Sequence, residues 1–167
     1  MRPNRHGSSV VEYPSELVIV TTRKFDAPLQ LVFDVFTQPE HVRNWFAPFT
    51  DEVTVCSIDL RVGGSYHIVF VTEEGRECSF RGTYSEVEPP TRTVATWLFE
   101  GWPDAEAVES EELREADGVT TLTMRLAFRD QAGRGHMTKS DGQEDSFNKL
   151  EDYLRSLLDQ EGAARGG

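Results

Sequence analysis

Residues 108–128 read VESEELREADGVTTLTMRLAF, two runs of strand-forming residues on either side of Asp117-Gly118. An Asp-Gly pair between two such runs is the strongest short-range signal for a β-hairpin, because both central positions of a tight type I′ turn need a positive φ. We therefore expect antiparallel strands over residues 108–116 and 119–128, joined by this turn.

The hairpin closes a longer series of strand-like segments that starts after Pro48. Each segment is short, carries β-branched and aromatic residues, and is bounded by turn signals such as glycine or proline pairs. The segments before the hairpin cover residues 53–58, 65–72, 77–87 and 93–99. Six successive strands with short links predict an antiparallel meander.

Residues 17–25 begin with the apolar run LVIV and continue with β-branched residues, which predicts a further strand before the meander. Pro28 follows, and proline is favoured at the start of a helix because its missing N–H would find no partner there anyway. The helix that it opens has one apolar face at helical spacing. That face consists of Leu29, Val32, Phe33 and Phe36.

Two more helices are predicted. Thr37 with Glu40 three residues later has the pattern of a capping box, so a second short helix starts there and ends near residues 45–46. A long helix runs from Ser140 or Asp141 to Gly162, because apolar residues return to helical spacing. Its apolar face carries Phe147, Leu150, Leu154, Leu157 and Leu158.

This order of elements predicts an α+β helix-grip fold, in which a curved antiparallel sheet of about seven strands wraps around the long C-terminal helix. The sheet must bury one apolar face, and only the last helix is long enough to cover it. Curvature then leaves a cavity between sheet and helix, a common place for a ligand. We expect one domain at residues 16–160 between flexible segments at residues 1–15 and 161–167, which are small and polar.

The charge balance disfavours two classes of partner. The chain carries 17 Lys and Arg against 29 Asp and Glu, a formal net charge of −12. Such a surface repels phosphate backbones and anionic lipids, so neither nucleic acid nor a membrane is expected as a partner. No stretch has the apolar length of a membrane span or of a signal peptide, and we expect a cytoplasmic protein.

No motif for a metal, a nucleotide or a covalent nucleophile is present, so neither a metal site nor a cofactor is predicted. The four histidines are scattered without the spacing of convergent metal ligands. They are His6, His41, His67 and His136. Cys56 and Cys78 lack CxxC spacing, and we expect two buried free thiols.

Several short motifs are similar to those of one protein family. They are FDAP at 25–28, VF at 32–33, PE at 39–40, WF at 45–46, DLRVGGSY at 59–66, RGTY at 81–84, VEPP at 87–90, Arg92 and TW at 96–97. With these motifs, the chain resembles, over about residues 17–158, the bacterial relatives of activators of the ninety-kilodalton heat-shock-protein ATPase. That family belongs to the SRPBCC superfamily, with START lipid-transfer domains, birch-pollen-allergen-like proteins and polyketide cyclases.

The resemblance implies the helix-grip fold and its cavity. It hardly touches chemistry, because the shared motifs are turns, a close glycine approach and strand pairing. Relatives usually carry Gly-Trp near the start of the last helix, whereas Gly142 is followed here by Gln143. We therefore expect the mouth of the cavity to differ from that of the relatives.

Bulky side chains on the predicted strands and short helices are the candidates to line the cavity. They are Trp45, Phe46, Phe70, Phe80, Trp97, Phe99, Met124 and Phe128. Together they would bind an apolar or aromatic ligand through the area removed from water. The alternative is that each of them simply fills the core.

The strand at residues 108–116 is unusual because Glu109, Glu111 and Leu113 share one face. If Leu113 points inward, two carboxyl groups do so as well. Burial would raise their pKa values, and the pair could act as general acid and base or bind a cationic group. The alternative is an exposed, twisted strand. His67 and Arg81, on neighbouring strands, are further candidates for a polar anchor.

Three functions are compatible with these features. The leading hypothesis is a non-catalytic protein that binds a small hydrophobic or amphipathic molecule. The second is a cyclase- or hydrolase-type enzyme, in which Glu109 or Glu111 works with His67 or Arg81 on an aromatic, polyketide-like substrate. The third, which the resemblance implies, is a regulator of a chaperone ATPase. A free sheet edge also allows a homodimer.

Overall fold

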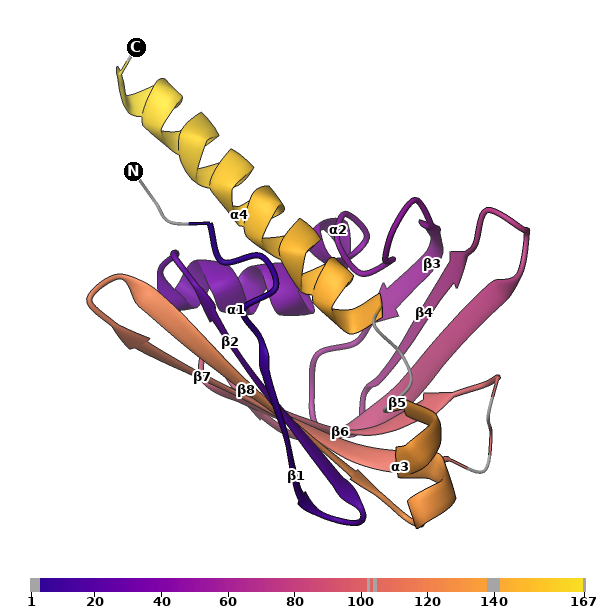
Figure 1. Cartoon of the computed structure of the whole chain (residues 1–167). Helices are drawn as coiled ribbons and strands as arrows, with labels where there is room; N and C mark the ends of the chain where they lie inside the picture. Colours follow the sequence, from indigo (N-terminus) through magenta and orange to yellow (C-terminus); the bar gives the residue numbers. More distant parts are fainter. Residues whose placement is uncertain (1–3, 102, 104, 138–141, 167) are drawn as a thin grey trace.

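The computed structural model describes residues 4–101, 103, 105–137 and 142–166. A single antiparallel sheet with strand order β1-β2-β8-β7-β6-β5-β4-β3 curves around the long helix α4 (Figure 1). The strands are β1 (Val10–Ser15), β2 (Val18–Phe25), β3 (Glu52–Ile58), β4 (Ser65–Val71), β5 (Glu77–Glu88), β6 (Arg92–Phe99), β7 (Ala107–Ala116) and β8 (Val119–Phe128). The helices are α1 (Leu29–Thr37), α2 (Pro39–Val42), α3 (Gln131–Met137) and α4 (Gly142–Gly166). The predicted α+β helix-grip class is confirmed.

The hairpin on which the prediction rested is present. Asp117 and Gly118 have φ values of 53° and 78°, and Ala116 pairs with Val119 across the turn. From this turn β7 and β8 remain in register along their whole length. Side chains two residues apart on these strands therefore share one face of the sheet.

The predicted count of seven strands is one too few. Residues 10–15, which we expected in a flexible N-terminal segment, form β1 and pair with β2 at the edge of the sheet. Val10, Val11 and Tyr13 suit a strand. All six residues of β1 are exposed, so no alternation of buried and exposed positions marks the strand in the sequence.

The short helices differ from the prediction in detail. The capping box at Thr37 is wrong, since its hydroxyl donates a hydrogen bond to the carbonyl oxygen of Phe33 at 2.7 Å and so belongs to the end of α1. Pro39, which is favoured in a first helical turn, begins α2 instead. The helix α3, at the far end of the sheet from α1 in Figure 1, was not predicted.

The last helix is longer than predicted. It begins at Gly142, whereas the predicted caps Ser140 and Asp141 lie outside the described residues. It passes through the predicted stop at Gly162 and ends at Gly166, so a helix replaces most of the expected C-terminal tail. A Cβ on Gly162 would meet no atom within 4 Å, so no neighbouring element imposes an end there.

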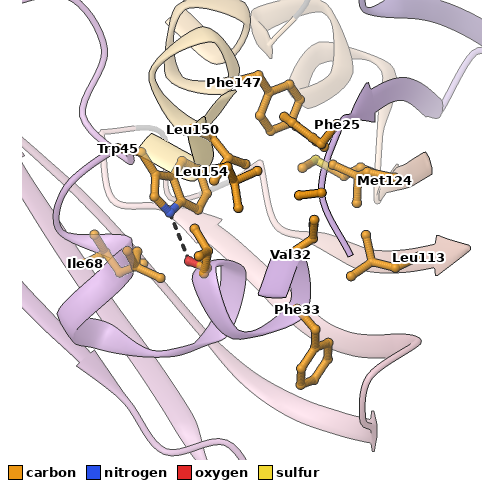
Figure 2. Packing of buried hydrophobic residues seen from close by; sticks show 14 of the residues in the cluster. Phe25, Val32, Phe33, Trp45, Ile68, Leu113, Met124, Phe147, Leu150 and Leu154 are labelled. Carbon is orange, nitrogen blue, oxygen red and sulfur yellow. Dashed lines mark hydrogen bonds between the residues drawn. The ribbon is translucent and has the colours of Figure 1, made fainter. Parts of the chain in front are cut away.

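The core lies between the concave face of the sheet and α4. Phe147, Leu150 and Leu154 of α4 are buried against α1 and the strands (Figure 2). The ring of Phe147 meets that of Phe25 edge to face at a centroid distance of 6.1 Å. No helix in the described ranges is long and apolar enough to cross a bilayer.

A buried charge ties α4 to the sheet. The side chain of Arg23 on β2 is 0% exposed, and its Nη2 lies 3.0 Å from Oε1 of Glu151 on α4. Nη2 also donates to Oδ1 of Asn148 at 3.0 Å, and Nη1 donates to the backbone oxygen of Lys24 at 2.8 Å. The helix is thus held to β2 by an ion pair with Glu151 and a charge-assisted hydrogen bond to Asn148, as well as by apolar packing.

Both cysteines are free thiols, as predicted. Cys78 is buried, whereas Cys56 is only half-buried, which corrects the prediction for that residue. Burial raises the pKa of both thiols, so at neutral pH they carry a proton and are poor nucleophiles.

Gly82 on β5 permits a close approach of β6. A Cβ at this position would lie 1.8 Å from the backbone oxygen of Thr96 and 2.7 Å from the ring of Tyr66. The backbone of Thr96 is held in the sheet and cannot shift without a loss of stability. We therefore expect Gly82→Ala to lower the free energy of unfolding by about 1 to 3 kcal/mol, as measured by urea titration. The matched variant Gly162→Ala in α4, where the space is open, should be neutral or stabilising.

Candidate functional site

A cavity of about 210 Å³ lies between the sheet, the α1–α2 segment and the first turns of α4. For comparison, an engineered apolar cavity of about 150 Å³ is large enough to hold benzene. The cavity is therefore large enough for a small aromatic molecule. Its described lining includes a set of mostly aromatic side chains, a set of polar side chains and several smaller aliphatic ones.

Most of the bulky residues predicted to line the cavity do so. Those in the lining are Trp45, Phe46, Phe70, Phe80, Trp97 and Met124. Phe46 lies edge to face with Phe80 at 5.5 Å, and Phe80 stacks on Phe70 at 5.7 Å. The indole N–H of Trp45 donates to the carbonyl of Val35 at 3.0 Å, so its polar atom is satisfied within the protein (Figure 2). We call these six residues the aromatic group.

Two other predicted residues lie outside the described lining. Phe99 stacks on Phe80 at a centroid distance of 5.0 Å, and Phe128 meets Trp97 edge to face at 6.0 Å. Both pack around residues of the aromatic group and do not face the empty space. Residue size and strand position alone do not distinguish a residue that lines the cavity from one that packs behind the lining.

Glu109 and Glu111 both line the cavity. Side chains alternate along β7, and Leu113, on the same face, is 5% exposed within the main core. The exposed-strand alternative is therefore wrong. Across the sheet Glu109 pairs with Ala95 and Glu111 with Thr93, so both carboxyl groups lie over the central strands.

The two carboxyl groups are neighbours on one face of β7, and Thr93 is the cross-strand partner of Glu111 on β6. Burial raises the pKa of both groups, that of Glu109 well above its ordinary range because the charge of Glu111 adds to the effect. Such a pair holds one proton between two groups. In this state the pair carries one negative charge.

His67 and Arg81 are placed on the opposite face of the sheet. They pair with each other across β4 and β5, one residue out of phase with the cavity-lining Tyr66 and Phe80. His67 is hydrogen-bonded to the Ser79 hydroxyl at 2.8 Å, and Arg81, 60% exposed, lies 3.6 Å from a carboxylate oxygen of Glu100. The structure therefore brings neither of them to Glu109 or Glu111.

The prediction missed four lining residues close to the carboxyl pair: Tyr66, Tyr84, Thr93 and Ala95. The tyrosine rings lie 5.8 Å apart, and the Tyr66 hydroxyl donates to the backbone oxygen of Thr96 at 3.1 Å. Burial raises the pKa of both tyrosines, and the nearby glutamates raise it further. Alternation from Phe70, Phe80 and Trp97 along their strands would have found all four. We call Glu109, Glu111, Thr93, Tyr66 and Tyr84 the polar group.

The N-terminal end of α4 contributes to the wall through Gly142, Gln143, Ser146 and Phe147. Gln143 accepts a hydrogen bond from the Thr21 hydroxyl at 3.3 Å, and its amide lies 3.2 Å from the sulfur of Met124. Ser146 donates to the backbone oxygen of Phe46 at 2.8 Å, which joins α4 to the segment after α2. An amide therefore stands where the relatives were expected to carry an indole.

Within the described part of the chain, one set of metal-type ligands has its atoms within 4.8 Å of one another: His6, Glu151 and Asp152. It lies outside the cavity lining. Glu151 in this set is already paired with Arg23, and His6 with Asp152 at 2.8 Å. These contacts account for the arrangement without an ion.

Two of three comparisons with known proteins gave matches. The profile of the family described as "Activator of Hsp90 ATPase homolog 1-like protein" matches residues 26–155. The comparison with curated proteins gave no match.

Several solved structures share the fold. A protein from Rhodobacter sphaeroides superimposes with a TM-score of 0.83 at 21% identity, over 89% of this chain and 99% of that one. A Nitrosomonas europaea protein reaches 0.76 at 24% identity, over 87% and 99%. DynU16, from the dynemicin biosynthetic locus, reaches 0.66 at 22% identity, over 85% and 48%. At these identities the likeness shows the fold alone.

Proposed function

Because the chain belongs to the Activator of Hsp90 ATPase homolog 1-like family, we propose that it binds a small hydrophobic or amphipathic molecule in the cavity between its sheet and α4. The observation that carries the proposal is the cavity itself, about 210 Å³ of space faced by the aromatic group. Apolar walls with a few polar groups at one side are typical of small-molecule sites. Native mass spectrometry of protein purified from its own host tests whether such a molecule is bound.

Filling the cavity should weaken binding. Ala95 lines the cavity, and a Phe side chain there would occupy space that a ligand needs. We expect Ala95→Phe to weaken binding of a neutral aromatic probe, 1-naphthalenemethanol, by about tenfold or more, because the ring loses its apolar contacts. Quenching of tryptophan fluorescence measures the affinity.

Val108→Phe is the matched control, because Val108 is 48% exposed and lies on β7 outside the cavity lining. It should bind the probe as the wild type does. Urea titrations of both variants establish that each is folded. Equal affinities for Ala95→Phe and Val108→Phe would contradict a ligand site in this cavity.

The carboxyl pair favours one second candidate, an enzyme acting on an aromatic or polyketide-like carbonyl compound. Glu111 would take a proton from the carbon beside the carbonyl, and Glu109 would give its proton to the carbonyl oxygen, which forms the enol that a cyclisation needs. His67 and Arg81 have no part in this version. Exchange of that carbon-bound hydrogen for deuterium, lost in Glu111→Gln, is the test.

A further inference from the structure

The polar group contains acids without a base. Among the described residues that line the cavity there is no Lys, Arg or His, so no lining cation faces Glu109 and Glu111. Glu109 and Glu111 are half-buried, whereas the buried Glu151 is held 3.0 Å from the Arg23 guanidinium. Carboxyl groups removed from water without a cation are costly and rare in proteins. A cation from outside the chain would complete this site.

We propose, on the basis of the ligand-binding function proposed above, that the bound molecule is an amphipathic cation: a protonated amine held between Glu109 and Glu111, with an apolar body against the aromatic group. Glu109 and Glu111 occupy successive inward positions of β7, and both line the cavity. An ammonium group has three N–H donors, and the two carboxylates offer four oxygens.

Other head groups fit the polar group less well. An anion would be repelled by the negative charge of the pair. A neutral alcohol or carbonyl could take a hydrogen bond from protonated Glu109, but it would leave the charge of Glu111 uncompensated. Only a cation gains from both carboxyl groups at once, and the net charge of −12 on the chain also attracts cations from solution.

Binding of a cation is coupled to the protonation of Glu109 and Glu111. Burial raises the pKa of both groups, so without ligand the pair takes up a proton at a higher pH than a glutamate in water does. A bound ammonium lowers those pKa values, so binding expels the proton, and the affinity for an amine rises as pH rises through the pair's pKa. The affinity for a neutral acceptor falls over the same interval, because Glu109 loses its donor.

No other described lining residue should titrate in this interval. Tyr66 on β4 and Tyr84 on β5 face the pair, and burial raises the pKa of both phenols. Cys56 on β3, beyond Tyr84, also has a raised pKa. The described lining residues from α1, α2 and α4 carry no titratable group.

Three probes of nearly equal shape test the proposal by calorimetry: 1-naphthylmethylamine, 1-naphthalenemethanol and 1-naphthoate. For the wild type at pH 7 we expect the amine to bind about tenfold or more tightly than the alcohol, and the naphthoate to bind weakest, because charge-assisted hydrogen bonds are the stronger kind. The binding enthalpy of the amine should differ between phosphate and Tris buffers, which reports the released proton.

The double variant Glu109→Gln with Glu111→Gln should lose the preference for the amine and still bind the alcohol. Glu112→Gln is the matched control, since Glu112 points to the other face of β7 and pairs with Arg92. If the alcohol binds and the amine binds no more tightly, or if the double variant keeps the preference, the cationic ligand is wrong and the apolar site stands. If no probe binds the wild type, both proposals fail.

Discussion

Arg23→Met is expected to lower the free energy of unfolding by about 3 to 5 kcal/mol, because it removes one partner of a buried ion pair and leaves the other. Arg23 is fully buried, and its guanidinium contacts Glu151, Asn148 and the backbone of Lys24. Methionine preserves much of the apolar stem, so the loss reports mainly the charge and its hydrogen bonds. Urea titration with a two-state analysis measures it.

Arg61→Met is the matched control for this prediction. Arg61 pairs with Asp59 at 2.8 Å, yet its side chain is 72% exposed. An exposed pair contributes about 0 to 1 kcal/mol, so this variant should unfold almost as the wild type does. A double variant, Arg23→Met with Glu151→Leu, should recover most of the lost stability because no unpaired charge remains. Equal losses for Arg23→Met and Arg61→Met would contradict the anchoring role of Arg23.

Local signals predicted most of the fold. The turn at Asp117-Gly118 requires positive φ, and the structure has it, so the register of β7 and β8 followed from two residues. The edge strand β1 was not predicted, because all of its residues are exposed and the sequence shows no alternation of buried and exposed positions there. The end of α4 was misplaced because a glycine in open space does not stop a helix that meets no other element.

The candidate site was predictable where one strand determined it. Alternation alone placed Glu109 and Glu111 on the face of Leu113, which is buried. His67 and Arg81 were grouped with them only because their strands are neighbours. Adjacency in a sheet says nothing about which face a side chain takes, and both residues have the opposite phase. Which aromatic rings face the cavity also depends on how rings from different strands pack against one another. The sequence of one strand does not contain that information.

The contribution of the pair Glu109 and Glu111 to the free energy of unfolding is expected to fall as pH rises above about 4.3, the ordinary pKa of a glutamate. Burial raises their pKa values in the folded state, so over this interval the folded protein binds more protons than the unfolded chain. Stability then decreases with pH by about 1.4 kcal/mol per unit for each proton that differs. The decrease ends where the pH passes the raised pKa values of the folded state.

The double variant Glu109→Gln with Glu111→Gln removes this dependence, since glutamine does not titrate. Urea titrations of the wild type and the double variant between pH 5 and pH 8 measure it, and we expect the stability of the double variant relative to the wild type to increase with pH. Glu112→Gln, on the outer face of the same strand, should follow the wild type at each pH. If the difference in the free energy of unfolding between the wild type and the double variant does not change with pH, both carboxyl groups titrate in the folded protein as they do in water. The ionised pair lowers the free energy of unfolding most at neutral and higher pH. A cation bound to Glu109 and Glu111 would compensate their charge, so it should stabilise the protein most in that same pH range.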